Sequence, residues 1–327
     1  MHNYSVAVVG VTGYSGREVD RLLKSHPSIH VDGRFTSKGD GAGVQAYSLA
    51  AVQQSRPDVV IAATEHEVSL RIVPELAAAG LRVIDMSGAF RMKDTALYPK
   101  WYGFEHTAPD ILQQAVYGMP ELFADKIRTA QVVANPGCYA TSVILPLSPL
   151  YTAGVISPSS LVVVDGKSGV SGAGRHPKIE THFCEVNENL RAYAVLRHRH
   201  TPEMLACLPQ ALAENFVFTP HLIPITRGIL STIVFQHAEG ASARSVLTSA
   251  YANSPFVKIT PEGILPDIHG VVHTNDCQIG IATSGRTTVL VSAIDNLVKG
   301  AAGQAIQNLN LMLGCETEAG LHPRLAQ

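Results

Sequence analysis

Short apolar runs alternate with amphipathic segments along the first 150 residues of the chain. Runs at residues 5–11, 29–37, 59–63, 82–86 and 129–134 are nearly continuous in apolar side chains, which is typical of strands buried on both faces of a sheet. Residues 14–25 and 67–79 have helical spacing, and Pro27 and Gly80 end these two segments. Strands that alternate with helices predict a parallel α/β sheet covered on both faces.

The pattern changes after about residue 155. Residues 161–165, 216–222, 229–236 and 287–294 are predicted strands, and some connections between them lack a helical pattern, so we expect a mixed or antiparallel sheet. Helices are predicted to begin at Thr201 and Ser242, and a closing helix at 298–313 ends at Gly314. The predicted domains are 1–145 with 297–327, and 146–296.

Composition narrows the class of protein. The 327 residues are 46% hydrophobic and only 16% charged, with a net charge of −2, which excludes disorder and offers no basic surface for nucleic acid or an anionic membrane. Five cysteines without a C-x-x-C pair argue against a disulfide framework and against a thiolate zinc site. No signal peptide or membrane span is recognisable. We therefore expect a cytoplasmic protein that acts on a small molecule.

A glycine-rich turn follows the first predicted strand and opens the first helix. Glycines at this place let the backbone approach a pyrophosphate, whose charge is stabilised by the helix N-terminus. The order of strand, turn and helix favours a dinucleotide site over a tight turn without a ligand. The predicted contacts in this loop are Gly10, Thr12, Gly13, Tyr14, Ser15 and Gly16.

The end of the second predicted strand indicates which nicotinamide cofactor binds. An NAD site usually carries an acidic residue there, which binds the ribose hydroxyls. Asp32 lies in the middle of this strand, whereas Ser37 and Lys38 stand at its end. A hydroxyl and a lysine suit a 2′-phosphate, so NADP is favoured; alternatively, Lys38 is a solvated surface charge.

Cys138 is the candidate nucleophile. It follows Pro136 and Gly137 at a turn between a predicted strand and a predicted helix. The positive end of a helix dipole lowers the pKa of a thiol and favours the reactive thiolate. Gly137 leaves room for an acyl group. The alternative interpretation of a cysteine is a small buried apolar side chain, and we apply it to the other four cysteines.

A pair of histidines precedes the helix predicted at Thr201. Thr201 is a good N-cap and Pro202 suits the first helical position. If the backbone before the cap is extended, His198 and His200 point to the same face. Near a helix N-terminus a histidine tends to stay neutral and is able to transfer a proton near pH 7. A metal site that includes Glu203, or two purely structural histidines, are the alternatives.

Together these residues resemble the N-acetyl-γ-glutamyl-phosphate reductase family over essentially the whole chain. The matching segments are residues 9–16, 85–91, 136–139, 168–175, 198–200 and 295–302. The resemblance implies an α/β fold with a Rossmann-type NADP-binding domain. It also implies an α+β catalytic and dimerisation domain with a mixed sheet, as in semialdehyde dehydrogenases. Ala140 departs from the proline that many relatives carry at that position.

The family's activity is the NADPH-dependent reductive dephosphorylation of N-acetyl-γ-glutamyl phosphate to N-acetylglutamate 5-semialdehyde, in arginine biosynthesis. The resemblance implies that a thioester forms on the cysteine, and that the enzyme is a homodimer or homotetramer. Arg91 and Arg175 suit phosphate or carboxylate, or alternatively form surface ion pairs. The roles implied are catalysis by Cys138, His198 and Glu203, substrate binding by His200, Arg91 and Arg175, and further cofactor contacts from Ser168, Gly169 and Asn296.

Three other functions remain as alternatives. Two are enzymes with the same chemistry: an aspartate-semialdehyde dehydrogenase and a reductase of carrier-linked aminoadipyl phosphate. The third is an NADP-binding regulator without activity. The His-Arg-His cluster and the loop at 168–174 favour the arginine pathway over the aspartate one. A nucleophile candidate together with a proton-transfer candidate argues against the regulator.

Overall fold

The computed structural model describes residues 4–41, 43–208 and 210–321, which form two compact units. The described part of the first unit is 4–137 with 301–321, and that of the second is 138–300. The functional domains expected from the sequence, 1–145 with 297–327 and 146–296, remain a prediction. Among the described residues, no helix is long and apolar enough to cross a membrane.

The first unit contains the parallel sheet that the apolar runs predict. Its strands follow the order β3-β2-β1-β4-β5-β7-β6 and pair in parallel throughout. The order reverses direction between β1 and β4, and the crevice at the carboxyl ends of the strands at such a switch point is where open α/β sheets bind ligands. The strands are β1 (Tyr4–Val9), β2 (Ile29–Thr36), β3 (Gln45–Ala46), β4 (Val59–Ala62), β5 (Val83–Asp85), β6 (Val116–Tyr117) and β7 (Val132–Ala134).

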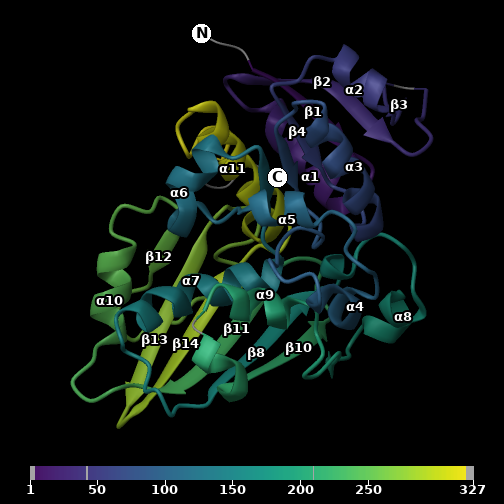
Figure 1. The fold of residues 1–327 in the computed structure, drawn as a ribbon. Helices are drawn as coiled ribbons and strands as arrows, with labels where there is room; N and C mark the ends of the chain where they lie inside the picture. Colours follow the sequence, from purple (N-terminus) through teal and green to yellow (C-terminus); the bar gives the residue numbers. More distant parts are fainter. Residues whose placement is uncertain (1–3, 42, 209, 322–327) are drawn as a thin grey trace. The chain divides into compact units, whose positions relative to one another are not determined.

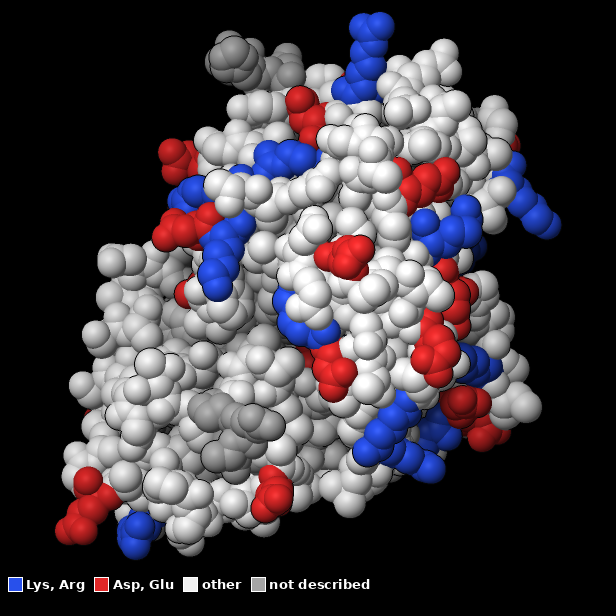
Figure 2. Space-filling view, in the orientation of Figure 1, with Lys and Arg blue, Asp and Glu red and all other residues white. Residues whose placement is uncertain are grey.

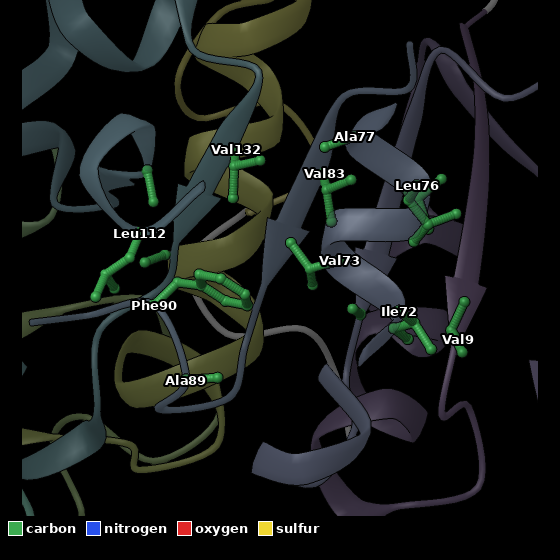
Figure 3. Packing of buried hydrophobic residues seen from close by; sticks show 14 of the residues in the cluster. Val9, Ile72, Val73, Leu76, Ala77, Val83, Ala89, Phe90, Leu112 and Val132 are labelled. Atoms are coloured by element: carbon green, nitrogen blue, oxygen red, sulfur yellow. The ribbon is translucent and has the colours of Figure 1, made fainter. Parts of the chain in front are cut away.

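Helices cover this sheet and bury an apolar core against it. Figure 3 shows Ile72, Val73 and Leu76 of α3 beside Val9 and Val83 of the strands, and all five side chains are buried. The last helix among the described residues, α11, packs against α1 and α6, so it belongs to the first unit. The helices are α1 (Tyr14–Lys24), α2 (Leu49–Gln54), α3 (His66–Ala78), α4 (Leu97–Tyr102), α5 (Pro109–Gln114), α6 (Pro120–Thr129) and α11 (Gly303–Leu313).

The second unit contains the mixed sheet that was expected, in the order β12-β13-β14-β11-β8-β10-β9. β8 and β10 are parallel, whereas β11 is antiparallel to both β8 and β14. The sequence did not indicate β13 or the two edge strands. The strands are β8 (Val162–Gly169), β9 (Arg191–Ala192), β10 (Phe216–Ile223), β11 (Ile229–Gln236), β12 (Val257–Ile259), β13 (Cys277–Ser284) and β14 (Thr287–Ile294).

Helix α7 lies on one face of this second sheet, where it packs against β11, β14, α9 and α10 (Figure 1). Its helical geometry continues through Pro146 and Pro149. The helices of the unit are α7 (Cys138–Thr152), α8 (Phe183–Val186), α9 (His200–Ala206) and α10 (Ala243–Ala250). Short helical turns are η1 (Val170–Ala173), η2 (Ile179–Thr181), η3 (Gln210–Asn215) and the π-helical η4 (Val298–Ala302).

Two helix starts differ from the prediction. Helix α9 begins at His200 rather than Thr201, because Arg199 already has helical dihedral angles and the Thr201 amide donates to His198 O at 2.9 Å. Thr201 is therefore not the N-cap, and its buried hydroxyl has no hydrogen-bond partner among the described residues. The segment 298–313 is a π-helical turn followed by α11, which ends at Gly314 as expected.

Charged side chains are sparse and mixed in sign on the face drawn in Figure 2. Lysine and arginine alternate there with aspartate and glutamate, and wide uncharged areas separate them.

Candidate active site

The turn between β1 and α1 has the geometry of a phosphate-binding loop. Gly10 has a φ of +89°, and a side chain there would place its Cβ 2.2 Å from Ala63 O, so only glycine fits. Gly13 precedes the first residue of α1 and has no side chain to cap it, and the first turn contains no acidic residue. The positive end of the helix dipole is thus left for an anionic group. Thr12 and Tyr14 of this loop are exposed.

The end of β2 places Ser37 and Lys38 at the surface. The strand ends at Thr36, whose hydroxyl accepts a hydrogen bond from the Gly39 amide, and both following residues are exposed. Asp32 lies in mid-strand, as expected, and its carboxylate accepts a hydrogen bond from the Ser5 hydroxyl at 2.6 Å. No carboxylate of β2 therefore stands at the strand end where a ribose-binding acid would be required.

A buried carboxylate, Asp85, organises the loop after β5. Its oxygens accept hydrogen bonds from the hydroxyls of Ser69 and Ser87 at 2.7 and 2.8 Å, and from the Ser87 amide at 3.1 Å. Burial raises the pKa of Asp85, while the two serines and the charge of Arg91 oppose the shift. Asp85 lies in the segment 85–91 that resembles the family, but no motif in that segment indicates a role for it.

Arg91 is buried, not a surface ion-pair residue. Only 9% of it is exposed, and its guanidinium donates to the backbone oxygens of Asn135 at 2.7 Å and Met86 at 2.9 Å. One of its bonds thus reaches the turn that leads to Cys138. Arg175, by contrast, is exposed just after η1.

Cys138 is the first residue of α7 and is partly exposed, as a thiol that attacks a substrate must be. The backbone of Gly300 lies against it. A Cβ on Gly300 would be 2.7 Å from the Cβ of Cys138, closer than real Cβ contacts. The glycine in the segment 295–302 is therefore required by the close approach of η4 to the candidate nucleophile.

The two histidines lie together in an aromatic cluster of the second unit. The ring centroids of His198 and His200 are 4.8 Å apart, and both side chains are buried. The ring of Tyr139, the residue after Cys138, packs edge-on against His198 at 5.5 Å, and the ring of Phe218 does so at 5.4 Å. Residues 195–197 and 199, on either side of His198, are turns rather than a strand, so the condition of an extended backbone is not met, yet the two imidazoles lie next to each other.

His198 is held as a neutral imidazole of one defined tautomer. Burial, with a smaller contribution from the charge of Arg199, lowers the pKa of His198 to about 3. The backbone amide of His200 donates to Nδ1 of His198 at 3.1 Å. Because Nδ1 accepts this bond, the single proton of the neutral ring is on Nε2. His198 therefore offers a hydrogen-bond donor at Nε2.

Glu203 lies next to His200. Its side chain is fully buried on α9, and Oε2 is 4.0 Å from Nε2 of His200. The catalytic role expected of Glu203 stays a prediction, and one hydrogen bond to the His198 ring comes from the backbone amide of His200. Among the described residues, no group of three or more histidine, cysteine, aspartate or glutamate side chains could hold a metal ion.

Ser168, Gly169 and Asn296 are joined in one hydrogen-bonded region of the second unit. The Asn296 amide group accepts from the Gly228 backbone at 2.7 Å and donates to the Ser171 hydroxyl at 2.9 Å. A Cβ on Gly169 would lie 2.8 Å from the backbone of Thr226. Asn296 therefore links the loops after β8 and β10, and Gly169 is required where these loops approach each other.

Tyr193 also belongs to the aromatic cluster around His198, although no sequence motif marks this tyrosine. Its hydroxyl and that of Tyr139 are hydrogen-bonded, and its ring packs against His198 at 5.5 Å. Burial, with a contribution from Cys138, raises the pKa of Tyr193 to about 12, so the hydroxyl stays protonated. In the sequence, only the position of Tyr193, five residues before His198, indicates that the two residues could lie close together.

Two known families match most of the chain. Residues 5–130 match "Semialdehyde dehydrogenase, NAD binding domain", and residues 138–296 match "Semialdehyde dehydrogenase, dimerisation domain". An N-acetyl-gamma-glutamyl-phosphate reductase of Desulfotalea psychrophila is 43% identical over 339 aligned positions, which cover 97% of each chain.

Solved structures with the same fold are aspartate semialdehyde dehydrogenases. The Vibrio cholerae enzyme II, complexed with ASA, superposes with a TM-score of 0.72 at 18% identity, over 96% of this chain and 99% of that one. The Candida albicans enzyme with NADP gives 0.68 at 13% identity, over 97% and 99%. Identity below 25% shows the fold alone, whereas the reductase similarity shows the family. The chain belongs to the N-acetyl-γ-glutamyl-phosphate reductase family and has the two-domain semialdehyde dehydrogenase fold.

Proposed function

We propose that this protein reduces N-acetyl-γ-glutamyl phosphate to N-acetylglutamate 5-semialdehyde with NADPH, in arginine biosynthesis. One observation carries the proposal beyond family membership: the second unit joins a partly exposed cysteine at a helix start to a cluster containing a neutral, buried histidine. These are the two groups that a covalent acyl transfer followed by reduction requires.

Cys138 acts as the nucleophile. Its sulfur forms a bond to the acyl carbon, and the bond from that carbon to the phosphate oxygen breaks, which releases inorganic phosphate and leaves a thioester. NADPH, when bound, supplies the hydride that reduces this thioester. The thiohemiacetal on Cys138 then collapses, because the carbon–sulfur bond breaks as the aldehyde forms, and the thiolate is regenerated.

His198 acts on the acyl oxygen of the substrate as a neutral hydrogen-bond donor, which is the part of the expected acid–base role that this tautomer allows. Its Nε2–H donates to the substrate oxygen on which negative charge develops, since Nδ1 already accepts the His200 amide. A neutral imidazole can stabilise this charge without transferring its proton. Glu203 acts next to His200 as the second acid–base group of the cluster, and His200 binds the substrate.

Arg91 and Arg175 recognise the anionic groups of the substrate. A guanidinium binds phosphate or carboxylate through two parallel hydrogen bonds. Arg175 is exposed, so it suits direct recognition. Arg91 adds a buried positive charge next to the backbone of Asn135.

The residues of the first unit fit NADP. The uncapped start of α1 and the loop containing Gly10, Gly13 and Gly16 would hold the pyrophosphate. Ser37 and Lys38, exposed at the end of β2, would bind the 2′-phosphate. Ser168, Gly169 and Asn296 would hold the nicotinamide end. The solved Candida albicans relative is described with NADP, in agreement with this choice.

Cofactor preference tests the role of Lys38. We expect kcat/KM to be higher with NADPH than with NADH. The change Lys38→Ala should lower the preference for NADPH, which is the kcat/KM with NADPH divided by that with NADH, about tenfold, since one charged phosphate contact is lost. Steady-state rates at matched cofactor concentrations measure it, and Lys24→Ala, also exposed in the first unit, is the control. Equal rates with both cofactors in the unchanged protein would remove the role assigned to Ser37 and Lys38.

We propose that the second unit also mediates self-association as a homodimer or homotetramer. Val163, Val217, Val234 and Val289 are cross-strand neighbours on β8, β10, β11 and β14, and all four are only partly buried. They alternate with the fully buried residues of the same strands, so they lie on the opposite face of the sheet. A row of partly exposed valines on a sheet face suits contact with a second copy. The family matched by this unit is named for dimerisation.

The proposed activity is tested in the reverse direction with N-acetylglutamate semialdehyde, NADP and inorganic phosphate. We expect NADPH to form, followed by its absorbance, and to require phosphate, because phosphate must attack the thioester to complete the turnover. Aspartate semialdehyde serves as the competing substrate in the same assay. A higher kcat/KM with aspartate semialdehyde, or turnover without phosphate, would contradict the proposal.

A further inference from the structure

We propose that Asn308, on helix α11 near the end of the chain, is a positioning residue that holds the turn leading to Cys138. The inference rests on the proposed role of Cys138 as the nucleophile. Asn308 is separated from this turn by more than 160 residues of sequence, and neither the family comparisons nor the sequence motifs assign it a role. Its side chain is fully buried.

The residue that Asn308 holds is Asn135, three positions before Cys138. The Nδ2 group of Asn308 donates to Oδ1 of Asn135 at 3.0 Å and to Gly118 O at 2.8 Å. Gly118 belongs to the same region, because its amide donates to Ala134 O at 2.8 Å. The side-chain amide of Asn308 thus links α11 to Gly118 and to Asn135, and both of these residues lie beside the end of β7.

Every polar group of Asn135 is hydrogen-bonded to a different segment of the first unit. Its amide donates to Asp85 O, and its carbonyl accepts from Arg91. Its side chain donates from Nδ2 to Ala301 O at 3.0 Å and accepts at Oδ1 from Asn308. Only 1% of Asn135 is exposed, so these four hydrogen bonds form in a buried setting and hold the residue in place. Pro136 and Gly137 connect Asn135 to Cys138, so Asn135 fixes one end of the turn that leads to the nucleophile.

The hydrogen bonds that hold this turn matter because the attack of a thiol on its substrate is sensitive to small displacements. A shift of about 1 Å in a reacting group can cost a hundredfold in rate even when its cause lies away from the chemistry. Residues that hold the turn before a nucleophile therefore act on kcat rather than on substrate affinity. Asn308 is the part of this network contributed by α11.

The experiment compares Asn308→Ala with Asn310→Ala. Both asparagines are fully buried on α11, and Asn310 bonds to His26, Thr317 and Ala319 instead of the turn. We expect Asn308→Ala to lower kcat about tenfold or more, with both KM values changed less than about twofold. Asn310→Ala should keep kcat within about twofold at a temperature where both variants are folded, although it loses more hydrogen bonds.

A second readout does not need turnover. The rate at which iodoacetamide alkylates Cys138, followed on its own peptide by mass spectrometry, should change several-fold in Asn308→Ala and shift in its pH dependence. It should be unaltered in Asn310→Ala. If Asn308→Ala does not fold, Asn135→Ala breaks the same hydrogen bond from the other side and is measured instead.

The inference is overturned if Asn308→Ala keeps normal kcat and normal alkylation, or if Asn310→Ala loses both to the same extent. Its failure is distinct from failure of the proposed function. A Cys138→Ser variant that still turns over would reject the nucleophile, whatever Asn308 does. An inactive Cys138→Ser with a fully active Asn308→Ala would reject the positioning role alone.

Discussion

Turnover of the acyl phosphate should fall by at least about three orders of magnitude when Cys138 is replaced by serine. A serine hydroxyl at the start of α7 is nearly isosteric with the thiol, so the fold and the contact with Gly300 are retained. Its pKa is far higher than that of a thiol, however, and no thioester can form to be reduced. The measurement is the phosphate-dependent formation of NADPH described above.

Two controls make this result specific to the nucleophile. Cys184→Ser changes an exposed cysteine of the same unit and should leave kcat unchanged. Binding of NADP to Cys138→Ser, measured by calorimetry, should be close to that of the unchanged protein, because none of the residues assigned to the cofactor is altered. A Cys138→Ser protein that turns over at a near-normal rate would rule out the covalent mechanism.

Replacing His198 by asparagine should lower kcat by about a hundredfold to a thousandfold, the range in which one hydrogen-bond donor to a developing oxyanion contributes. Asparagine can still accept the His200 amide through its side-chain oxygen, so the local geometry is kept while the Nε2 donor is lost. The loss should be mainly in kcat. The exposed His269→Asn is the matched control, with normal kinetics.

The same variant should also reduce the acid sensitivity of the fold. The pKa of His198 is about 3 in the folded protein against 6.5 for an unperturbed histidine. Between these values the unfolded state binds more protons, so the stability contributed by the neutral ring is complete above pH 6.5 and is lost as the pH falls. From pH 7 to pH 5 the loss is about 2 kcal/mol for this side chain.

Denaturant unfolding at pH 7 and pH 5 measures this contribution. The difference in unfolding free energy between the two pH values should be smaller by about that amount in His198→Asn than in the unchanged protein, and unaltered in His269→Asn. Burial also lowers the pKa of His26, but this contribution is present in all three proteins and cancels. An unchanged pH dependence in His198→Asn would show that folding does not lower the pKa of His198.

Much of the fold could be predicted from the sequence because its signals are local. The run at 5–11 became β1 followed by the glycine turn and α1, and the alternating pattern at 216–222 became β10. Edge strands such as β12 and β9 were missed because two or three residues provide no measurable period. Strand β13 was also missed, since its polar second half resembles a loop.

The candidate site was predicted in part. Cys138 and the two histidines were found because motifs mark them, whereas Tyr193 and Asn308 have no motif whose chemistry points to them. The start of α9 was misplaced, because Thr201 has the composition of an N-cap but the helix is continued backwards by the turn at Arg199. Asp85 was quoted only as part of a segment, whereas Arg91 was a candidate for phosphate or carboxylate recognition. The burial of these two residues could not be seen from their neighbours in the chain.

The sequence by itself determined the family, the order of the elements and the identity of the chemical groups, because each depends on residues close together along the chain. Tertiary structure alone decided the protonation and orientation of those groups. The pKa of His198 depends on rings at residues 139, 193 and 218, and the turn before Cys138 is held from residue 308. Desolvation and hydrogen bonding act through space, so contacts between distant residues fix them only when the chain has folded.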